Sequence, residues 1–291
     1  MMSATTVDPE LERIHTVVSQ TYAAWNSRQT DNANPYFREA PEDMFFDYWP
    51  LRFDDWKTYK NGAQAYLDTL EVQKITEKQI RVQRLGNVAW TSATYDVDPV
   101  SKKGEKFHVR DGRHTSVLIK TDGAWKVCHE HWSPKAPQEP LPTYPGASGV
   151  RTIKAASGED AIRSVTNKIL KAWSEMDINK CMSLYRRDSQ DSFFHLYNGR
   201  LEKWEEFAHE LQNFFSQHES LTIEPKDSRV FREEDVAWTA ITWEARETLR
   251  NGATFTRSGR YTAVLLALES RWQIVHEHWS VPVRAAGWEN Y

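Results

Sequence analysis

The chain has 291 residues, of which 40% are apolar and 27% are charged, with a net charge of −4 and a pI near 6.2. This length is typical of about two globular domains, and the composition provides enough apolar material for a core in each. No basic stretch is long enough to follow a phosphate backbone, which argues against nucleic acid as a partner. The two cysteines, Cys128 and Cys181, form neither a disulfide framework nor a metal motif, and this favours a reducing compartment.

The amino-terminal residues 1–12 are polar and acidic and lack the apolar segment of a signal peptide. No apolar run approaches the roughly 20 residues that a membrane-spanning helix requires. We therefore expect a cytoplasmic protein without a membrane partner.

The chain contains an internal duplication. Residues 112–133 and 259–280 are identical at 11 of 22 positions, and both segments end in His-Glu-His-Trp-Ser. Upstream, matching residues such as Trp25 and Trp173 are 148 positions apart, whereas the carboxy-terminal matches are 147 apart. A repeat of this length exceeds the solenoid periods, so each copy is expected to bury its own core. We predict domains over 1–134 and 158–291, joined by a proline-rich linker over 135–157.

Apolar spacing predicts the elements of each copy in chain order. In the first copy these are a helix over 11–26, a shorter helical stretch ending near Phe37, a brief aromatic strand over 44–49, a helix from Asp54 to about Leu70, and strands over 75–85, 87–97, 106–120 and 125–133. The second copy repeats the order from Ile162, with strands near 220–231, 235–248, 255–268 and 272–280. Helices followed by a long antiparallel meander predict an α+β fold in which helices cover one face of a curved sheet. Such a sheet leaves a conical cavity that suits a small ligand.

This order, with its Trp-Lys-Val-Cys-His-Glu-His-Trp-Ser ending, resembles the nuclear-transport-factor-2-like superfamily and, more closely, its SnoaL-like group. The resemblance covers both copies. It implies two tandem cone-shaped barrels, each a curved antiparallel sheet packed on about three helices, that form an intramolecular pseudo-dimer, and it leaves a further homodimer open. The superfamily includes isomerases, dehydratases, cyclases, other lyases and non-enzymatic modules, so the resemblance does not settle the reaction.

The short aromatic strand carries the first candidate site. Alternation would place Phe45, Asp47 and Trp49 on one face, and Phe193, His195 and Tyr197 on the matching face of the second copy. A carboxylate between aromatic rings loses hydration, which favours proton transfer, but Asp47 could instead turn outward or only hold the strand end. Asp47 resembles the position of the general-base aspartate in ketosteroid-isomerase-like members, from which His195 departs. We interpret Asp47 and His195 as catalytic. The substrate-binding candidates on these strands are Phe45, Tyr48, Trp49 and Tyr197.

The repeated His-Glu-His strand offers a second set of candidates. Its two histidines lie two residues apart on one strand face, which suits a metal only if a third ligand is present. His114 could supply that ligand in the first copy, but Tyr261 replaces it in the second. We therefore predict no metal. One histidine of each pair would anchor a hydrogen-bond network, while His131 and His278 would line the cavity as catalytic groups.

Arg113 and Arg260 are the remaining substrate-binding candidates. If either points into the cone, it could bind a carboxylate or enolate oxygen. With a hairpin loop of two or four residues they would share a strand face with Glu130 and Glu277, and an Arg–Glu pair is then expected. A β-bulge would swap these faces.

The sequence lacks GxSxG, HExxH, P-loop and GxGxxG motifs. The leading hypothesis is a lyase or isomerase that needs no cofactor and uses general acid–base chemistry on a small hydrophobic substrate, aromatic or polycyclic. One alternative is a non-catalytic ligand-binding or scaffolding module. Another is a division of labour, in which one copy is catalytic and the other structural.

Overall fold

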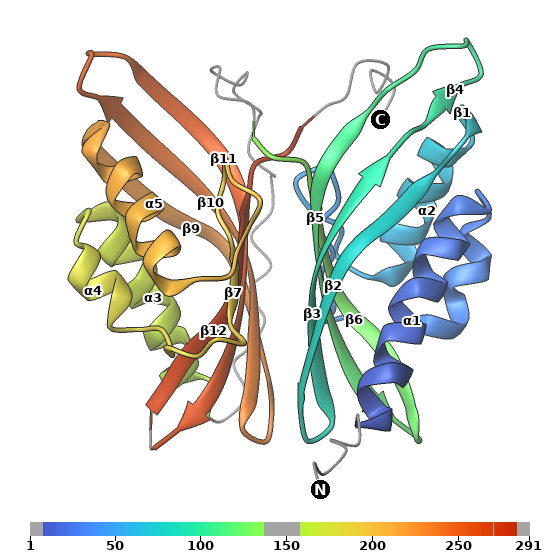
Figure 1. Cartoon of the computed structure of the whole chain (residues 1–291), viewed down its shortest axis with the longest axis horizontal. Coiled ribbons are helices and arrows are strands. Elements are labelled where there is room, and N and C mark those ends of the chain that lie inside the picture. Colours follow the sequence, from blue (N-terminus) through green and yellow to red (C-terminus); the bar gives the residue numbers. More distant parts are fainter. Residues whose placement is uncertain (1–7, 137–157, 270, 284–291) are drawn as a thin grey trace, which may run out of the picture. The chain divides into compact units, whose positions relative to one another are not determined.

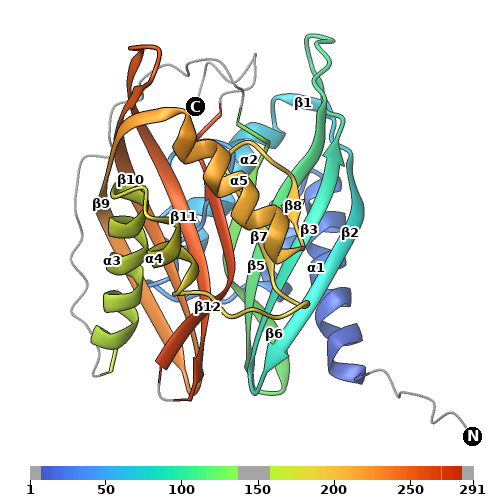
Figure 2. The ribbon, with the colours of Figure 1, turned by 60° about the vertical axis from the view of Figure 1, so that its left-hand side comes forward.

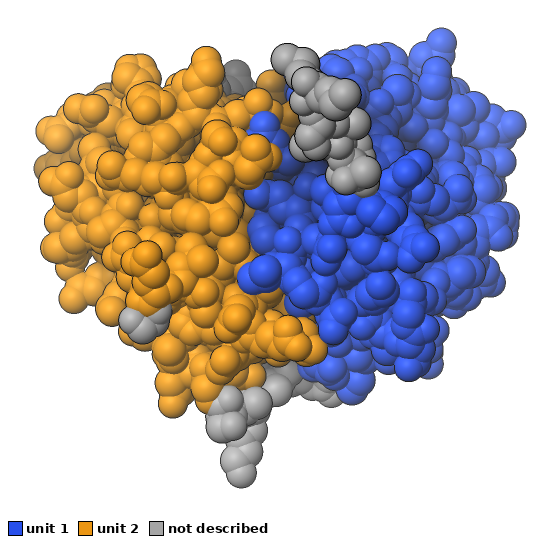
Figure 3. All heavy atoms as spheres, turned by 60° about the horizontal axis from the view of Figure 1, so that its bottom comes forward, with its two compact units in different colours: residues 1–45, 54–130, 285–291 blue, residues 46–53, 131–284 orange. Residues whose placement is uncertain are grey.

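A computed structural model describes residues 8–136, 158–269 and 271–283. These residues form two compact units, which Figure 3 distinguishes by colour. The described part of unit 1 covers residues 8–45 and 54–130, and that of unit 2 covers residues 46–53 together with the described residues from 131 onward. The segments 46–53 and 131–133 of the first sequence copy therefore belong to unit 2. Most of the predicted linker, from residue 137, lies outside the described residues.

Unit 1 holds the helices and strands of the first copy. They are α1 (Pro9–Asn26), the 3-10 helix η1 (Thr30–Tyr36), α2 (Trp56–Leu67), β1 (Leu70–Val72), β2 (Ile75–Leu85), β3 (Val88–Val97), β4 (Val100–Ser101), β5 (Val109–Thr121) and β6 (Ala124–Ser133), whose last three residues belong to unit 2. The main sheet has the order β2-β3-β5-β6, and β1 pairs with β4. Helices α1 and α2 lie on the same side of the main sheet (Figure 1).

Unit 2 holds the elements of the second copy. They are α3 (Asp160–Ser174), α4 (Ile178–Met182), β7 (Ser192–Phe194), β8 (Arg200–Leu201), α5 (Trp204–Ser216), β9 (His218–Glu233), β10 (Val236–Leu249), β11 (Thr254–Leu268) and β12 (Arg271–Ser280). Their sheet has the order β8-β7-β12-β11-β10-β9, and β7 runs parallel to β12. Helices α3, α4 and α5 cover one face of this sheet (Figures 1 and 2).

Aromatic packing fills the space between helices and sheet in unit 2. Trp173 of α3 lies against Trp279 of β12, with ring centroids 4.7 Å apart, and Trp279 in turn lies 5.8 Å from Trp243 of β10. All three rings are buried. Two of them, Trp173 and Trp279, recur in the first copy as Trp25 and Trp132, which fits a shared requirement for core packing.

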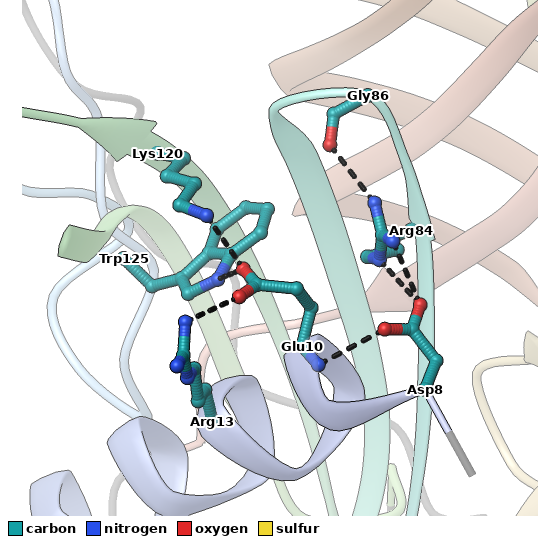
Figure 4. Close-up of polar contacts among 7 residues, drawn as sticks. All are labelled: Asp8, Glu10, Arg13, Arg84, Gly86, Lys120 and Trp125. Atoms are coloured by element: carbon teal, nitrogen blue, oxygen red, sulfur yellow. Dashed lines mark hydrogen bonds and ion pairs between the residues drawn. The ribbon is translucent and has the colours of Figure 1, made fainter. Parts of the chain in front are cut away.

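The amino terminus of α1 is fixed to the sheet of unit 1 by polar contacts (Figure 4). Asp8 caps the helix by accepting a hydrogen bond from the Glu10 N–H, and its second carboxylate oxygen accepts from Arg84 Nε at 2.8 Å. The Glu10 carboxylate accepts from Trp125 Nε1 at 2.9 Å and from Lys120 Nζ at 2.8 Å. These hydrogen bonds lower the pKa of Glu10 to about 2.

The predicted α+β fold is confirmed, because helices pack on curved antiparallel sheets in both copies. The brief aromatic strand is shorter than the prediction. In unit 2 it ends at Phe194, and in the first copy Phe46 forms only an isolated bridge to His131. A cis peptide bond precedes Pro50 within the following bend. Strand alternation therefore does not extend to Trp49.

Two β-bulges adjust the registers. On β5, Arg110 and Asp111 together face Asp96 of β3, whereas β11 has one residue at this place, and this accounts for the change of offset from 148 to 147. On β12, Val275 is the extra residue, because Val264 pairs with His276 and Leu265 pairs with Ile274. The second bulge places Arg260 on the face opposite to Glu277. The expected Arg–Glu pair is therefore wrong for the second copy.

Candidate functional site

Unit 2 contains a pocket of about 380 Å³, which lies within the usual range for small-ligand sites. The loop after β7, the end of α5 and strands β9 to β11 supply its walls. Its lining residues are His195, Tyr197, Asn198, Glu210, Asn213, Phe214, Gln217, His218, Glu247, Leu249, Phe255 and Arg257. Aromatic rings and ionisable groups thus converge on one pocket.

Two predicted site residues, His195 and Tyr197, meet in this pocket. The His195 imidazole stacks on the Trp173 indole at a centroid distance of 5.2 Å, and the edge of Phe214 lies 5.3 Å away. The Tyr197 ring lies 6.4 Å from the imidazole. Packing on two sides fixes the orientation of His195, and the Tyr197 phenol lies beside its imidazole in the pocket.

Three further lining residues, His218, Glu247 and Arg257, were missed by the sequence analysis. Together with His195 and Tyr197 they form a polar wall of the pocket. The Tyr197 hydroxyl oxygen accepts a hydrogen bond from Arg257 Nη1 at 2.7 Å, while Arg257 Nε lies 3.2 Å from Glu247 Oε1. The other Glu247 oxygen lies 3.2 Å from His218 Nε2. Burial raises the pKa of Tyr197, so its hydroxyl keeps its proton at neutral pH and remains a donor.

This wall is specific to the second copy. At the constant offset of 148 residues, the counterparts of its ionisable residues in the first copy are Asp47 for His195, Trp49 for Tyr197, Leu70 for His218, Pro99 for Glu247 and Val109 for Arg257. The strand registers support this alignment, because Leu70 pairs with Ser101 as His218 pairs with Leu249. Comparison of the two copies is the sequence signal that could have revealed the three missed residues.

His278 and Arg260 lie elsewhere in unit 2. Both lie on the face of their strands that bears Thr262 and Ser280, opposite to the face of the core residue Trp279. Arg260 donates to Ser280 Oγ at 2.9 Å and to the Val281 carbonyl. Neither residue lines the 380 Å³ pocket.

His131 also belongs to unit 2 and is fully buried there. Its ring stacks on that of His278 at 3.7 Å with an interplanar angle of 8°. Its nitrogens lie 2.9 Å from Thr262 Oγ1 and 2.6 Å from Ser280 Oγ. The structure thus brings His131 and His278 together, but away from His195.

The other predicted site residues come from the first sequence copy and do not line this pocket; Phe45 and Arg113 belong to unit 1, whereas Asp47, Tyr48 and Trp49 belong to unit 2. Phe45 is buried and stacks on Tyr59 at 5.0 Å, and Arg113 is also buried. Asp47 is half-buried, and its Oδ1 accepts a hydrogen bond from the Tyr48 N–H at 2.7 Å. Tyr48 is buried and Trp49 is half-buried.

Each copy also contains a buried carboxyl group, Glu130 or Glu277, that the sequence analysis considered only as a partner for an arginine. Glu277 of β12 accepts hydrogen bonds from the hydroxyls of Tyr185 at 2.6 Å and Tyr261 at 3.2 Å, and burial raises its pKa to about 7. In unit 1, Glu130 accepts from the Tyr59 hydroxyl and lies 3.3 Å from His114. Both carboxyl groups lie in packed interiors, and Glu277 is not among the residues that line the pocket.

Within the described ranges, no group of three or more His, Cys, Asp or Glu side chains is arranged to hold a metal ion. None of the described helices is both long and apolar enough to cross a bilayer.

In each copy helices cover one face of a curved antiparallel sheet, and the second copy contains the pocket lined by His195 and Tyr197. These features define a class of small α+β domains that can bind a ligand beside the sheet. The profile of the SnoaL-like domain matches residues 14–137 and 162–284, so the chain belongs to the SnoaL-like family and contains two tandem copies of its domain.

Solved structures with a similar fold each correspond to about half of the chain. A nuclear-transport-factor-2-like superfamily protein from Salmonella enterica is 22% identical, with a TM-score of 0.42, and the match covers 46% of this chain and 96% of that one. A ketosteroid isomerase-like protein from Erwinia carotovora is 18% identical, with a TM-score of 0.40 and coverage of 44% and 100%. A search of curated proteins found no significant match.

Proposed function

We propose that the chain is a lyase or isomerase that needs no cofactor and works by general acid–base catalysis in the unit 2 pocket. The observation that carries this proposal is the meeting of His195 with Tyr197, whose hydroxyl oxygen accepts from Arg257. His195 would remove a proton from a carbon next to a carbonyl. Tyr197 would donate its hydroxyl proton in a hydrogen bond to the carbonyl oxygen as negative charge develops there.

The neighbouring arginine strengthens this assignment. A phenol oxygen that accepts from a guanidinium becomes a better donor through its own O–H, because hydrogen bonds in a chain polarise one another. The aromatic wall formed by Phe214 and Phe255 suits a small aromatic or polycyclic substrate.

For the first copy we propose a structural role, which makes the chain an example of divided labour. Its core is filled by aromatic stacking, with Phe37 on Trp56 at 3.8 Å and Phe45 on Tyr59 at 5.0 Å. Its positions equivalent to His218 and Glu247 are Leu70 and Pro99, which offer no ionisable group.

The test is exchange of the α-protons of 2-tetralone, an enolisable bicyclic ketone, in deuterated buffer, followed by proton NMR. We expect the wild type to accelerate exchange and His195→Ala to reduce the rate by about 100-fold or more, while circular dichroism shows that the variant remains folded. Tyr197→Phe should also slow exchange. Equal exchange rates for wild type and His195→Ala would contradict the proposal.

Asp47→Asn decides whether the first copy takes part. Divided labour predicts an exchange rate close to that of the wild type. A loss comparable with that of His195→Ala would instead assign proton transfer to both residues, and the first copy would then be catalytic as well.

A further inference from the structure

The proton positions in the pocket wall follow from His218. Its Nδ1 lies 2.7 Å from the Phe214 carbonyl oxygen, which can only accept, so Nδ1 carries a hydrogen. Its Nε2 lies 3.2 Å from a carboxylate oxygen of Glu247. A nitrogen lone pair facing a carboxylate would be repulsive, so a proton lies between these two atoms as well.

This geometry sets the net charge of the cluster formed by His218, Glu247 and Arg257. If the shared proton resides on His218, two positive charges and one negative charge are present. If it resides on Glu247, only the charge of Arg257 remains. The cluster therefore carries one net positive charge in either arrangement.

The cluster is well shielded from solvent, with side-chain exposures of 3% for His218, 3% for Glu247 and 9% for Arg257. The other titratable groups that line the pocket are His195, Tyr197 and Glu210. Of these only Glu210 opposes the cluster with a negative charge, and it lies half-buried on α5. A net charge in a shielded wall is costly unless an opposite charge meets it.

The fold itself does not require this charge. The first copy has the same fold with Leu70 in β1, Pro99 between β3 and β4, and Val109 in β5 at the equivalent positions. A buried ionic cluster that the same fold can omit is better explained by a ligand than by stability.

We infer that the unit 2 pocket binds a small aromatic carboxylate, whose negative charge neutralises the cluster. Among the residues that the structure describes, no protein acceptor bonds to Arg257 Nη2, so this group and the Tyr197 hydroxyl can both donate to a carboxylate. The rings of Phe214 and Phe255 would contact the aromatic part. The inference rests on the proposed function only in taking this pocket as the substrate site.

The experiment compares two probes of nearly equal shape, 2-naphthoate and 2-naphthamide, by calorimetric titration of the full chain. The wild type should bind the carboxylate at least about tenfold more tightly than the amide. Arg257→Gln and His218→Gln should each remove this preference, because each reduces the net charge of the cluster to zero.

The double variant His218→Gln, Glu247→Gln separates charge from structure. It leaves the Arg257 charge alone, so the preference for the carboxylate should return, although two native side chains are lost. Arg110→Gln is the matched control, because it removes an exposed arginine that pairs with Asp98 in the first copy, and it should change neither affinity. Glu210→Gln should strengthen binding of the carboxylate.

Equal affinity for the two probes overturns the inference, as does failure of 2-naphthoate to bind at millimolar concentration. Absence of recovery in the double variant also overturns it, provided that its melting temperature matches that of His218→Gln. The titration measures binding without turnover. Its failure therefore leaves the proton-exchange test of the proposed function standing, and failure of the exchange test leaves anion binding intact.

Discussion

At the scale of single residues, Glu277 is a fully buried carboxyl group in unit 2. Its pKa is about 7 in the folded chain, compared with 4.5 for an ordinary glutamate, because burial disfavours the charged form more than the hydrogen bonds from Tyr185 and Tyr261 favour it. Between pH 4.5 and about pH 7, Glu277 is therefore protonated in the folded state and ionised in the unfolded state. In that window the free energy of unfolding falls as pH rises.

Glu277→Gln should remove this dependence. We expect the variant to gain stability relative to the wild type between about pH 5 and about pH 8, by on the order of 3 kcal/mol, since one unit of pKa corresponds to about 1.4 kcal/mol. Denaturant unfolding at the two pH values measures this difference. An equal effect of the substitution at both values would show that Glu277 does not titrate in this range.

The residues of the candidate site were only partly predictable. His195 and Tyr197 stood out because they follow an aromatic strand at positions where the copies differ. His218, Glu247 and Arg257 come from separate strands and have no motif spacing, so only the three-dimensional pairing of strands brings them together.

At the scale of elements, the last strand of each copy is anchored by the first histidine of its His-Glu-His motif. His276 of β12 donates from Nδ1 to the Ser192 carbonyl of β7 at 2.7 Å, and His129 makes the same contact with the Met44 carbonyl at 2.5 Å. Burial lowers the pKa of both histidines to about 4. Their contribution to stability is therefore lost as pH falls from about 6.5 towards 4.

His276→Leu tests this anchor. The substitution leaves a buried carbonyl without its donor, so the free energy of unfolding near pH 7 should fall by about 1–3 kcal/mol. Near pH 4 the wild type loses stability because the unfolded state binds a proton at this histidine more readily than the folded state does. The difference in free energy of unfolding between the two proteins should therefore shrink. Melting curves across this range measure it, and a difference that widens in acid would contradict the assignment.

The approximate limits of the long strands were predictable, because apolar periodicity indicates where each strand lies along the chain. The bulges were not, because one extra residue leaves the hydrophobic pattern of each flanking segment unchanged while it exchanges the faces of the strand. Val275 in β12 therefore reversed the expected relation between Arg260 and Glu277.

Gly259 marks a further contact between elements. It pairs with Trp243 of the neighbouring strand, and a methyl group at this position would overlap the indole ring. Gly259→Ala should lower the free energy of unfolding by about 1–3 kcal/mol, as overpacking of a core usually does. Adding Trp243→Phe should recover part of this loss, because the smaller ring leaves room. Additive losses in the double variant would contradict steric overlap.

At the scale of the whole molecule, the compact units do not follow the sequence repeat. His131 lies in the first sequence copy, yet it packs in unit 2 on His278 and against Thr262 and Ser280. The two rings are fully buried and nearly parallel, so removing one leaves the other with a void. The stability of unit 2 should therefore depend on a residue that a division by sequence repeat assigns to the other domain.

A double-mutant cycle with His131→Ala and His278→Ala measures this dependence in the full chain. We expect each substitution to lower the free energy of unfolding, and their effects to be non-additive by about 0.5–1.5 kcal/mol, because each removes the same ring contact. His209 lies exposed on α5, so a cycle of His131→Ala with His209→Ala should be additive and provides the control. Additivity in both cycles would show that the stacked pair contributes no coupling, and that His131 stabilises unit 2 only through its bonds to Thr262 and Ser280.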